Sequence, residues 1–335
     1  MRNGLIDLYR FVLILWIVLF HFTYGYNEAY NDFAPISFSF VFKNGGSVGT
    51  TIFFILAGWY MGHTIEIGVF KGIGDYLRYC IKRYWRFWPA YFFAVLIIYL
   101  FLLLFPLPEY EVGLGKFIVN ALLIFHPGIG FIDGAHWFLS ALLVTQLVTA
   151  LVTFTPTHWR KWIIYASCLI LAVYFWEWEY EPTMAFIYLG SELKLLMGVS
   201  LFFVFKKWEK NKLLTLFFTA ALTFLVFYSI SLRPYLAALS VTITIMLICL
   251  HVKIQLPSLL SKCATYFGSL AFAWYLIHQR IGYSIMYHIL SKGDMSFLWL
   301  IIPVSITLLL AICVDYLSGK LNRFCINRYN VFDKH

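Results

Sequence analysis

The sequence predicts an all-α, polytopic integral membrane protein with about ten transmembrane helices. Of its 335 residues, 62% are apolar, 21% aromatic and only 12% charged, and the charged share is about half that of an average soluble domain. Apolar runs of roughly 20 residues, the length needed to cross about 30 Å of hydrocarbon, recur from one end of the chain to the other. A water-soluble fold is therefore not expected.

Ten spans account for the apolar runs. They are residues 5–25, 47–66, 87–106, 136–156, 162–177, 184–205, 213–231, 235–252, 266–288 and 297–316. The stretch 113–126 is also apolar, but it is short and runs into a Pro-Gly pair. We expect this stretch to be a re-entrant or interfacial piece of the loop before the fourth span.

The distribution of basic residues predicts the orientation, because cytoplasmic loops collect Lys and Arg. With both termini in the cytoplasm, the inner segments hold eighteen Lys and Arg residues and the outer segments hold four. The four outer ones are Lys43, Lys116, Arg233 and Lys292. An eleventh span would move the later basic clusters to the wrong side, so the charge pattern favours ten.

The positions of the charged residues also indicate whether the chain carries a signal peptide and whether it binds nucleic acid. The first apolar run carries Asp7 and Arg10, so we expect a retained helix and not a cleaved signal peptide. The net charge of +9 falls in short clusters between apolar runs, which indicates membrane topology and no nucleic-acid partner. The six cysteines show no paired C-x-x-C spacing, so neither a disulfide framework nor a metal site is expected. One membrane domain is expected to fill residues 1–335.

Ionisable side chains inside the predicted spans are candidates for function, because each costs about 2.5 to 3.5 kcal/mol to insert near the bilayer centre. Arg10 and His21 lie eleven residues apart in the first span. At 100° per residue this spacing returns them to within about 20° of the same helix face, about 16 Å apart along the axis. A snorkelling Arg10 and an interfacial His21 would also explain the pair. Glu192 in the sixth span and His278 in the ninth are further candidates.

Several motifs resemble those of the acyltransferase 3 family of membrane O-acyltransferases. The segment GLIDLYRFVLILWIVLFHF, residues 4–22, resembles the family's first helix with its Arg-x10-His motif, on which Arg10 and His21 fall. GTTIFFILAGWYMG, residues 49–62, resembles the second helix, although Ala57 stands where Ser is usual. KRYWRFWPAYF, residues 82–92, resembles the basic entry to the third helix and supplies Arg83 and Arg86.

Two shorter matches follow. HWFLSALL, residues 136–143, resembles a Trp-x-Leu-Ser element with Trp137 and Ser140, but it lacks the Glu that many members carry next. AWYLIHQ, residues 273–279, resembles a late element with Tyr275 and His278. Some relatives carry an additional extracellular hydrolase-like domain, and none is expected after the last span here.

The resemblance implies an O-acyltransferase of the bacterial cytoplasmic membrane that moves an acyl group, acetyl from acetyl-coenzyme A in the first instance, to a hydroxyl of an envelope or exported glycan. It implies His21 as base or nucleophile, Arg10 as a donor-orienting residue, and Arg83 and Arg86 as ligands of coenzyme A phosphates. The remaining candidates would line the acceptor side. These are Trp137, Ser140, Glu192, Tyr275 and His278.

Two other classes of function stay open from the residues alone. A transporter or flippase for lipid-linked sugars would use Arg10, Glu192 and His278 as substrate or proton-relay sites, but it predicts an internal repeat that the sequence does not show. A purely structural membrane subunit leaves the shared face of Arg10 and His21 unexplained. Consumption of acyl-coenzyme A separates these classes, whereas oligomeric state is not readable from the sequence.

Overall fold

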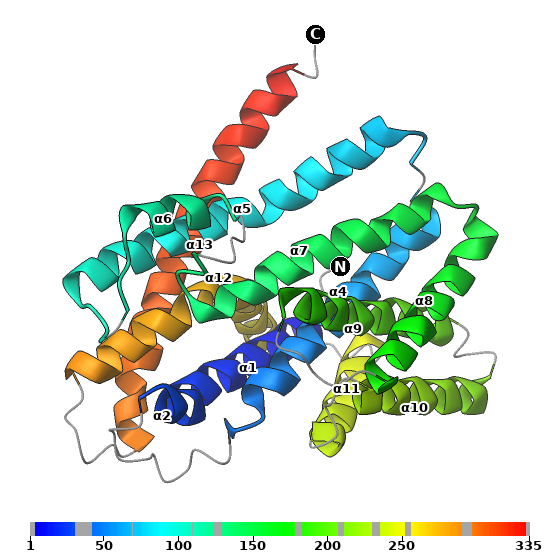
Figure 1. Ribbon diagram of the computed structural model, residues 1–335, viewed down its shortest axis with the longest axis horizontal. Coiled ribbons are helices and arrows are strands. Elements are labelled where there is room, and N and C mark those ends of the chain that lie inside the picture. The colour runs from blue at the N-terminus through cyan, green and yellow to red at the C-terminus, as the bar shows by residue number, and fades with distance from the viewer. Residues whose placement is uncertain are drawn as a thin grey trace. The chain divides into compact units, whose positions relative to one another are not determined.

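All regular elements in the described part of the chain are helices (Figure 1). The computed structural model describes residues 4–30, 42–68, 70–108, 110–123, 129–177, 183–206, 211–229, 235–251, 256–289 and 297–332. The main helices are α1 (Gly4–Phe20), α4 (Gly45–Ile67), α5 (Ile73–Leu104), α6 (Leu114–Ala121), α7 (Trp137–Ala150), α8 (Thr157–Glu177), α9 (Met184–Phe205), α10 (Lys212–Ser229), α11 (Leu236–His251), α12 (Ser258–Ile289) and α13 (Ile301–Phe332).

Each of the ten predicted spans overlaps one of these helices. Six helical segments in the described residues are long and apolar enough to cross a membrane. They are Gly4–Ala29, Gly45–Ile67, Ile73–Leu104, Gly134–Phe154, Ala185–Phe205 and Ile301–Arg323. The number of crossings and the side on which the termini lie remain predictions.

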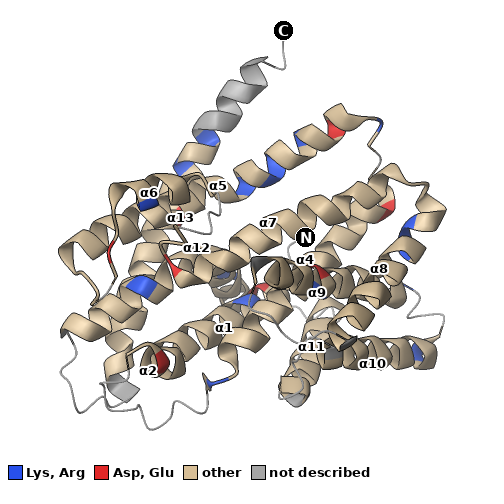
Figure 2. Cartoon of the chain, in the orientation of Figure 1, with Lys and Arg blue, Asp and Glu red and all other residues tan. Residues whose placement is uncertain are grey.

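Helix boundaries depart from the predicted spans where charged residues continue a helix beyond its apolar core. α5 begins at Ile73 instead of residue 87, and its first turns carry several basic residues (Figure 2). α12 begins at Ser258 and α13 continues to Phe332 for the same reason. The short stretch after Gly113 forms the eight-residue α6, which at about 1.5 Å per residue cannot span the hydrocarbon.

The chain divides into two compact units, each assembled from separate stretches of sequence. The first unit comprises Met1–Gly49, Trp85–Ser140 and Met246–His335. The second comprises Thr50–Tyr84 and Ala141–Ile245. The two units are described separately below.

In the first unit, α1 and α12 pack side by side and run in the same direction. A Cβ added at Gly268 would lie 2.6 Å from the Asp7 Cβ, and one added at Gly282 would overlap the ring of Phe22. Glycines at both places let the two helix backbones approach closely, as small residues do in membrane helix pairs. The part of α5 from Trp85 onward also runs parallel to α12, because Phe87 lies near Phe272 and Ser284 donates a hydrogen bond to the Phe105 carbonyl at 2.6 Å.

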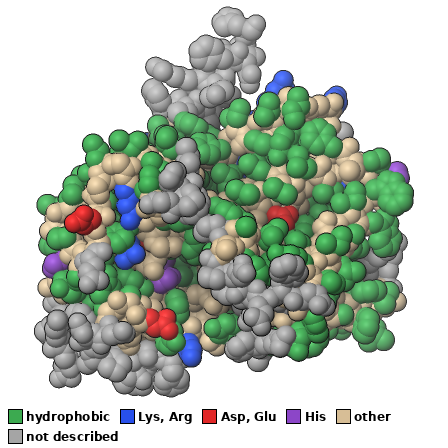
Figure 3. Space-filling model, viewed as in Figure 1, with side chains coloured by type: hydrophobic (Ala, Val, Ile, Leu, Met, Phe, Trp, Pro, Cys, Tyr) green, Lys and Arg blue, Asp and Glu red, His purple; other side chains and the backbone are tan. Residues whose placement is uncertain are grey.

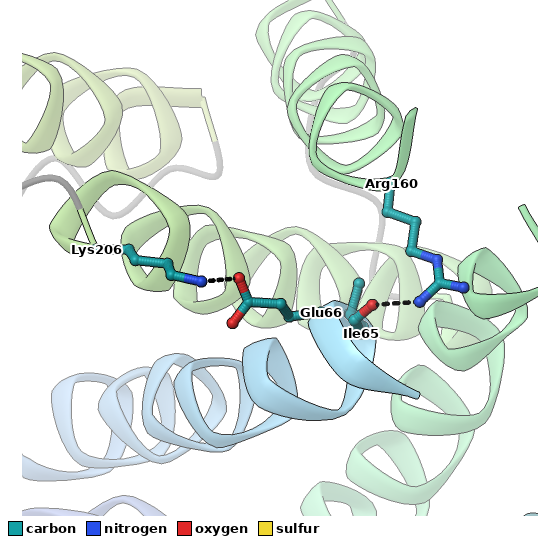
Figure 4. A network of polar contacts seen from close by, with 4 residues as sticks. All are labelled: Ile65, Glu66, Arg160 and Lys206. Carbon is teal, nitrogen blue, oxygen red and sulfur yellow. Dashed lines mark hydrogen bonds and ion pairs between the residues drawn. The ribbon is translucent and has the colours of Figure 1, made fainter. Parts of the chain in front are cut away.

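In the second unit, α4 and α9 cross at a pair of glycines. A Cβ at Gly58 would overlap the Leu195 carbonyl, and a Cβ at Gly198 would lie 3.0 Å from the Gly58 Cα. Gly58, in the segment GTTIFFILAGWYMG, therefore has a packing role. At the C-terminal end of α4, Glu66 forms an ion pair with Lys206 of the segment after α9 (Figure 4).

Arg160, at the start of α8, holds together the ends of two other helices in this second unit. Its side chain is 3% exposed. Its guanidinium donates to the carbonyls of Ile65 and Gly68 at the end of α4, at 2.8 and 2.5 Å, as Figure 4 shows for Ile65. It also donates to the carbonyls of Thr153 and Thr155, at 2.8 and 2.9 Å. A cation here satisfies carbonyls that a helix end leaves without partners.

Both units expose large apolar side chains along their helices, and apolar atoms cover most of the face in Figure 3. In α10 and α11, for example, the exposed residues include Leu213, Leu216, Phe217, Phe224, Val241 and Ile248. Soluble proteins rarely expose apolar surface so extensively. With six spans of sufficient length and hydropathy, the chain is a multi-pass membrane protein.

Candidate active site

His21 lies where the helical geometry of the first segment changes. α1 ends at Phe20, and the chain continues as a single π-helical turn over His21–Gly25. Such turns are rare and occur frequently at functional sites. The His21 Nδ1 atom lies 3.3 Å from the Tyr283 hydroxyl of α12, and its ring centroid lies 5.0 Å from that of His278. By surface area, His21 is intermediate between buried and exposed.

His278 is fully buried beside His21, and its hydrogen bonds define its tautomer. Its Nδ1 atom lies 2.8 Å from the Tyr275 carbonyl and 3.2 Å from the Trp274 carbonyl. Carbonyl oxygens only accept hydrogen bonds, so Nδ1 carries a proton and the neutral ring keeps its lone pair on Nε2. Nε2 has no hydrogen-bond partner among the described residues. His278 therefore presents a buried proton acceptor in the immediate neighbourhood of His21.

The segment before α7 is bound tightly to this part of α12. Asp133 is fully buried, and its carboxylate accepts from the backbone N–H groups of Ala135 at 2.8 Å and Arg280 at 2.9 Å. The His136 Nε2 atom donates to the Leu276 carbonyl at 2.8 Å. In a regular α-helix the N–H of Arg280 points toward the C=O of Leu276. The side chains of Asp133 and His136 therefore bind α12 at the same helical turn. These hydrogen bonds hold the segment before α7 against the turn of α12 that carries His278.

Tyr275 belongs to the same contact, whereas Trp137 and Ser140 lie further along α7. The Tyr275 hydroxyl donates to the Ala135 carbonyl at 2.7 Å and the residue is buried. Its position indicates a role in holding α12 and leaves little surface for an acceptor. Trp137 is the first residue of α7 and is partly exposed, and Ser140 is buried one turn later.

Arg10 forms an ion pair with a carboxylate that the sequence reading did not assign to it. Its Nη1 atom lies 3.5 Å from Asp7 Oδ1, and the Asp7 side chain is 1% exposed while that of Arg10 is 31% exposed. Asp7 in turn packs against Gly268 of α12. Arg10 is therefore anchored at the opposite end of the α1–α12 pair from His21.

Arg83 and Arg86 lie one helical turn apart in α5, but not at its N-terminus. Because α5 begins at Ile73, their backbone N–H groups belong to the helix interior and are not free to bind phosphate. The Arg83 Nε atom donates to the Tyr79 hydroxyl at 3.0 Å, and Arg86 is exposed. Any anion would be bound by the guanidinium groups.

Glu192 lies in the second unit, on α9. It accepts a hydrogen bond of 2.5 Å from the Thr149 hydroxyl of α7, and its other carboxylate oxygen is buried without a hydrogen-bond partner among the described residues. This pairing links α7 and α9. The structure therefore gives Glu192 a packing contact and no contact that marks it as a substrate ligand.

Sequence reasoning missed Asp133, His136 and Tyr283. His136 lies in a motif that the sequence analysis recognised, but no role was predicted for this residue, and Asp133 was not among the candidates. The available signal was local: an Asp just ahead of a helix is typical of a helix N-cap. Tyr283 had no such signal, because its contact with His21 joins segments 262 positions apart.

Replacing Asp133 with asparagine is expected to destabilise the first unit by about 1 to 3 kcal/mol. The amide has one acceptor oxygen where the carboxylate uses two, so its NH2 group would face a buried backbone N–H. Thermal unfolding of the purified protein in detergent measures the effect. Asp75→Asn is the matched control, because Asp75 pairs with Arg78 at an exposed position, where ion pairs contribute little. Equal melting temperatures for the two variants would contradict the assignment.

The arrangement around His21 can move protons and bind an electrophile. His278 has a proton-accepting nitrogen beside His21, and the Tyr283 hydroxyl can donate to or accept from His21. These are the components of general-base or nucleophilic catalysis by an imidazole. Within the described residues, no group of three or more His, Cys, Asp or Glu side chains is placed to hold a metal ion.

Comparisons with known proteins agree with this chemistry. No curated protein and no solved structure gives a significant match to the chain. The family model described as an acyltransferase domain matches residues 3–317, which covers α1, α5, α12 and the histidines between them. The chain therefore belongs to the acyltransferase 3 family.

Proposed function

We propose that the protein is a membrane O-acyltransferase that transfers an acyl group, acetyl from acetyl-coenzyme A, to a hydroxyl of an envelope or exported glycan. The observation that carries this proposal is the pair of imidazoles, His21 and His278, in a chain of an acyltransferase family. The site would lie in the cytoplasmic membrane of a bacterium, in contact with membrane lipids.

Transfer from a thioester to a hydroxyl requires removal of the hydroxyl proton and departure of the thiolate. In the direct route, His21 accepts the proton as the hydroxyl oxygen bonds to the carbonyl carbon, the C–S bond breaks, and coenzyme A leaves as a thiolate that takes up a proton. In the two-step route, a His21 nitrogen bonds to the thioester carbonyl carbon, the C–S bond breaks and coenzyme A leaves as a thiolate that takes up a proton, so the acyl group is held as an acyl-imidazole. The acceptor hydroxyl oxygen then bonds to the acyl carbon, the C–N bond to His21 breaks, and the released imidazole takes up the hydroxyl proton.

The donor would be held by the basic part of α5 and by Arg10. Coenzyme A carries several phosphates, and guanidinium groups bind phosphate with paired, charge-assisted hydrogen bonds. Arg83 and Arg86 supply two such groups one turn apart. Arg10, held by Asp7, would orient the donor. Trp137 and Ser140 are assigned to the acceptor side, while Glu192 and Tyr275 are assigned supporting roles.

The test of the proposal is turnover of acetyl-coenzyme A by the full chain in membranes, measured as release of free thiol together with glycan ester content. Thiol release that depends on the protein supports the assignment. A protein that neither binds nor consumes any acyl-coenzyme A, yet moves a lipid-linked sugar across vesicles, would instead be a transporter.

Replacing Arg83 with alanine is expected to raise the KM for acetyl-coenzyme A about tenfold or more with a small change in kcat. Loss of one charge-assisted hydrogen bond to phosphate costs about 1.5 to 3 kcal/mol, and about 1.4 kcal/mol corresponds to tenfold in affinity. Initial rates at varied donor concentration measure this. Arg78→Ala, which removes an exposed arginine earlier in α5, is the control. A KM that rises equally in both variants would point to general loss of positive charge.

A further inference from the structure

Two cations of the first unit meet at one aromatic ring, near the candidate active site. The Arg280 guanidinium carbon lies 4.0 Å from the centroid of the Tyr110 ring, and the Lys116 ammonium lies 4.2 Å from the same centroid. Arg280 is two residues after His278 on α12, a rise of about 3 Å and a turn of about 200° along the helix. It reaches the His21 side through Tyr30, to which it forms a hydrogen bond and whose ring centroid lies 5.9 Å from that of Tyr283. On the face drawn in Figure 3, basic groups lie close to a histidine, where Figure 2 places the basic positions of α6 and α12.

The backbone around these cations is held in place. The Tyr110 hydroxyl donates to the Ile132 carbonyl at 2.6 Å. Asn120 of α6 is buried; its amide group donates to the Gly130 carbonyl at 3.1 Å and its oxygen accepts from Ile132 N–H at 2.8 Å. These bonds fix α6, with Lys116, to the segment that leads to Asp133. Both positive charges therefore lie against a ring that is held by a defined structure.

No carboxylate forms an ion pair with either cation within the described residues. Neither Arg280 nor Lys116 forms an ion pair there. The nearby Asp133 carboxylate is engaged by two backbone N–H groups. Burial raises the pKa of Tyr110 to about 12, so its phenol is uncharged at neutral pH. Burial and the charge of Arg280 lower the pKa of Lys116, and the Arg280 Nε atom is buried without a hydrogen-bond partner among the described residues.

We infer that Arg280 and Lys116 bind an oxyanion carried by the acceptor, a carboxylate or a phosphate, and thereby place the acceptor hydroxyl beside His21. An anion here removes the repulsion between the two cations and satisfies the donors of Arg280. The inference rests on the proposed function, because only an acceptor would bring its anion to the His21 end of α1. An acidic sugar and the pyrophosphate of a lipid-linked sugar are the two sources of such a group.

A binding measurement tests the site without requiring turnover. Inorganic pyrophosphate and glucuronate are added separately to the detergent-solubilised full chain, and the melting temperature is followed. At least one anion should raise the melting temperature of the wild type, and the rise should be lost in Lys116→Gln and Arg280→Gln. It should persist in Lys116→Arg, which keeps the charge. Lys43→Gln is the matched control, because Lys43 also lies over a tyrosine ring, at 5.2 Å from the Tyr24 centroid.

Pyrophosphate could also bind at Arg83 and Arg86, so a further variant distinguishes binding at this donor site from binding at Lys116 and Arg280. The rise attributed to the acceptor anion must survive in Arg83→Ala. The inference is overturned when neither anion stabilises the wild type, or when the stabilisation persists in both Lys116→Gln and Arg280→Gln. A response to pyrophosphate alone indicates a lipid-linked acceptor, and a response to glucuronate alone indicates an acidic sugar.

Acyl transfer provides the second readout and distinguishes failure of the inference from failure of the proposed function. A glucuronate-terminated or polyprenyl pyrophosphate-linked disaccharide should have a KM about tenfold below that of the neutral free disaccharide, and Lys116→Gln should abolish the difference. Equal KM values with normal acetyl-coenzyme A turnover overturn the inference alone. Absence of any acetyl-coenzyme A turnover, with the anion response intact, overturns the proposed function instead.

Discussion

Replacing His21 with glutamine is expected to lower acyl transfer about 100-fold to 10,000-fold, the range in which a positioned acid–base group contributes to catalysis. Glutamine retains hydrogen bonding to Tyr283 but can neither accept the hydroxyl proton nor hold an acyl group. Transfer of radiolabelled acetyl to the glycan, measured in membranes with matched protein amounts, gives the effect. No other single change at the His21 end of α1 is expected to reduce the rate as much.

Tyr283→Phe provides the graded control for this prediction. It removes the hydroxyl that lies 3.3 Å from His21 Nδ1 while preserving the aromatic ring, so the imidazole loses orientation but stays chemically competent. A loss of about tenfold is expected, in line with one hydrogen bond. If His21→Gln transferred acetyl at the wild-type rate, the catalytic assignment would be wrong, whatever the family.

The same preparations distinguish the two routes of transfer. An acyl-imidazole on His21 would allow label to exchange between acetyl-coenzyme A and free coenzyme A without any acceptor, whereas direct transfer would not. His278 is not the attacking group in either route, because it is fully buried while His21 is partly exposed. Exchange that required His21 would identify the two-step route.

Much of the fold could be predicted because the membrane simplifies the problem. Apolar runs long enough to cross the hydrocarbon must be helical, since every backbone polar group there needs an internal partner. Each predicted span therefore overlaps a helix, and the stretch after Gly113 forms a helix of only eight residues. The ends were predicted less well: Ile73 and Ser258 begin their helices well before the apolar core, where hydropathy carries no signal.

The candidate site was predictable only where a residue was conspicuous by itself. His21 and His278 stood out as ionisable groups in apolar spans, and the structure places their rings 5.0 Å apart. Their neighbours depend on tertiary contacts. Asp133 acts by inserting beside Arg280, 147 positions away, and no periodicity in either segment encodes that pairing. The π-helical turn at His21 likewise has no local sequence signature.

Replacing Arg160 with methionine is expected to cost about 3 to 5 kcal/mol of stability in the second unit. Methionine approximates the length of the side chain but leaves four carbonyls, those of Ile65, Gly68, Thr153 and Thr155, without their donor. Each unsatisfied buried group costs about 1 to 3 kcal/mol, partly recovered through relaxation and water. Thermal unfolding in detergent and the yield of folded protein from membranes both report this loss.

Two further variants show whether the geometry or the charge of the Arg160 side chain stabilises the second unit. Arg160→Lys keeps the positive charge but has three donors on a compact ammonium in place of a planar fork, so it should recover only part of the lost stability. Lys161→Ala, at the neighbouring position where the ammonium lies 5.1 Å from the Trp162 ring centroid, should change stability by less than about 1 kcal/mol. Full recovery by lysine would mean that the charge at the helix ends suffices. An unchanged melting temperature in Arg160→Met would show that the four carbonyls find other donors, and that the end of α4 is held by contacts such as Glu66 with Lys206.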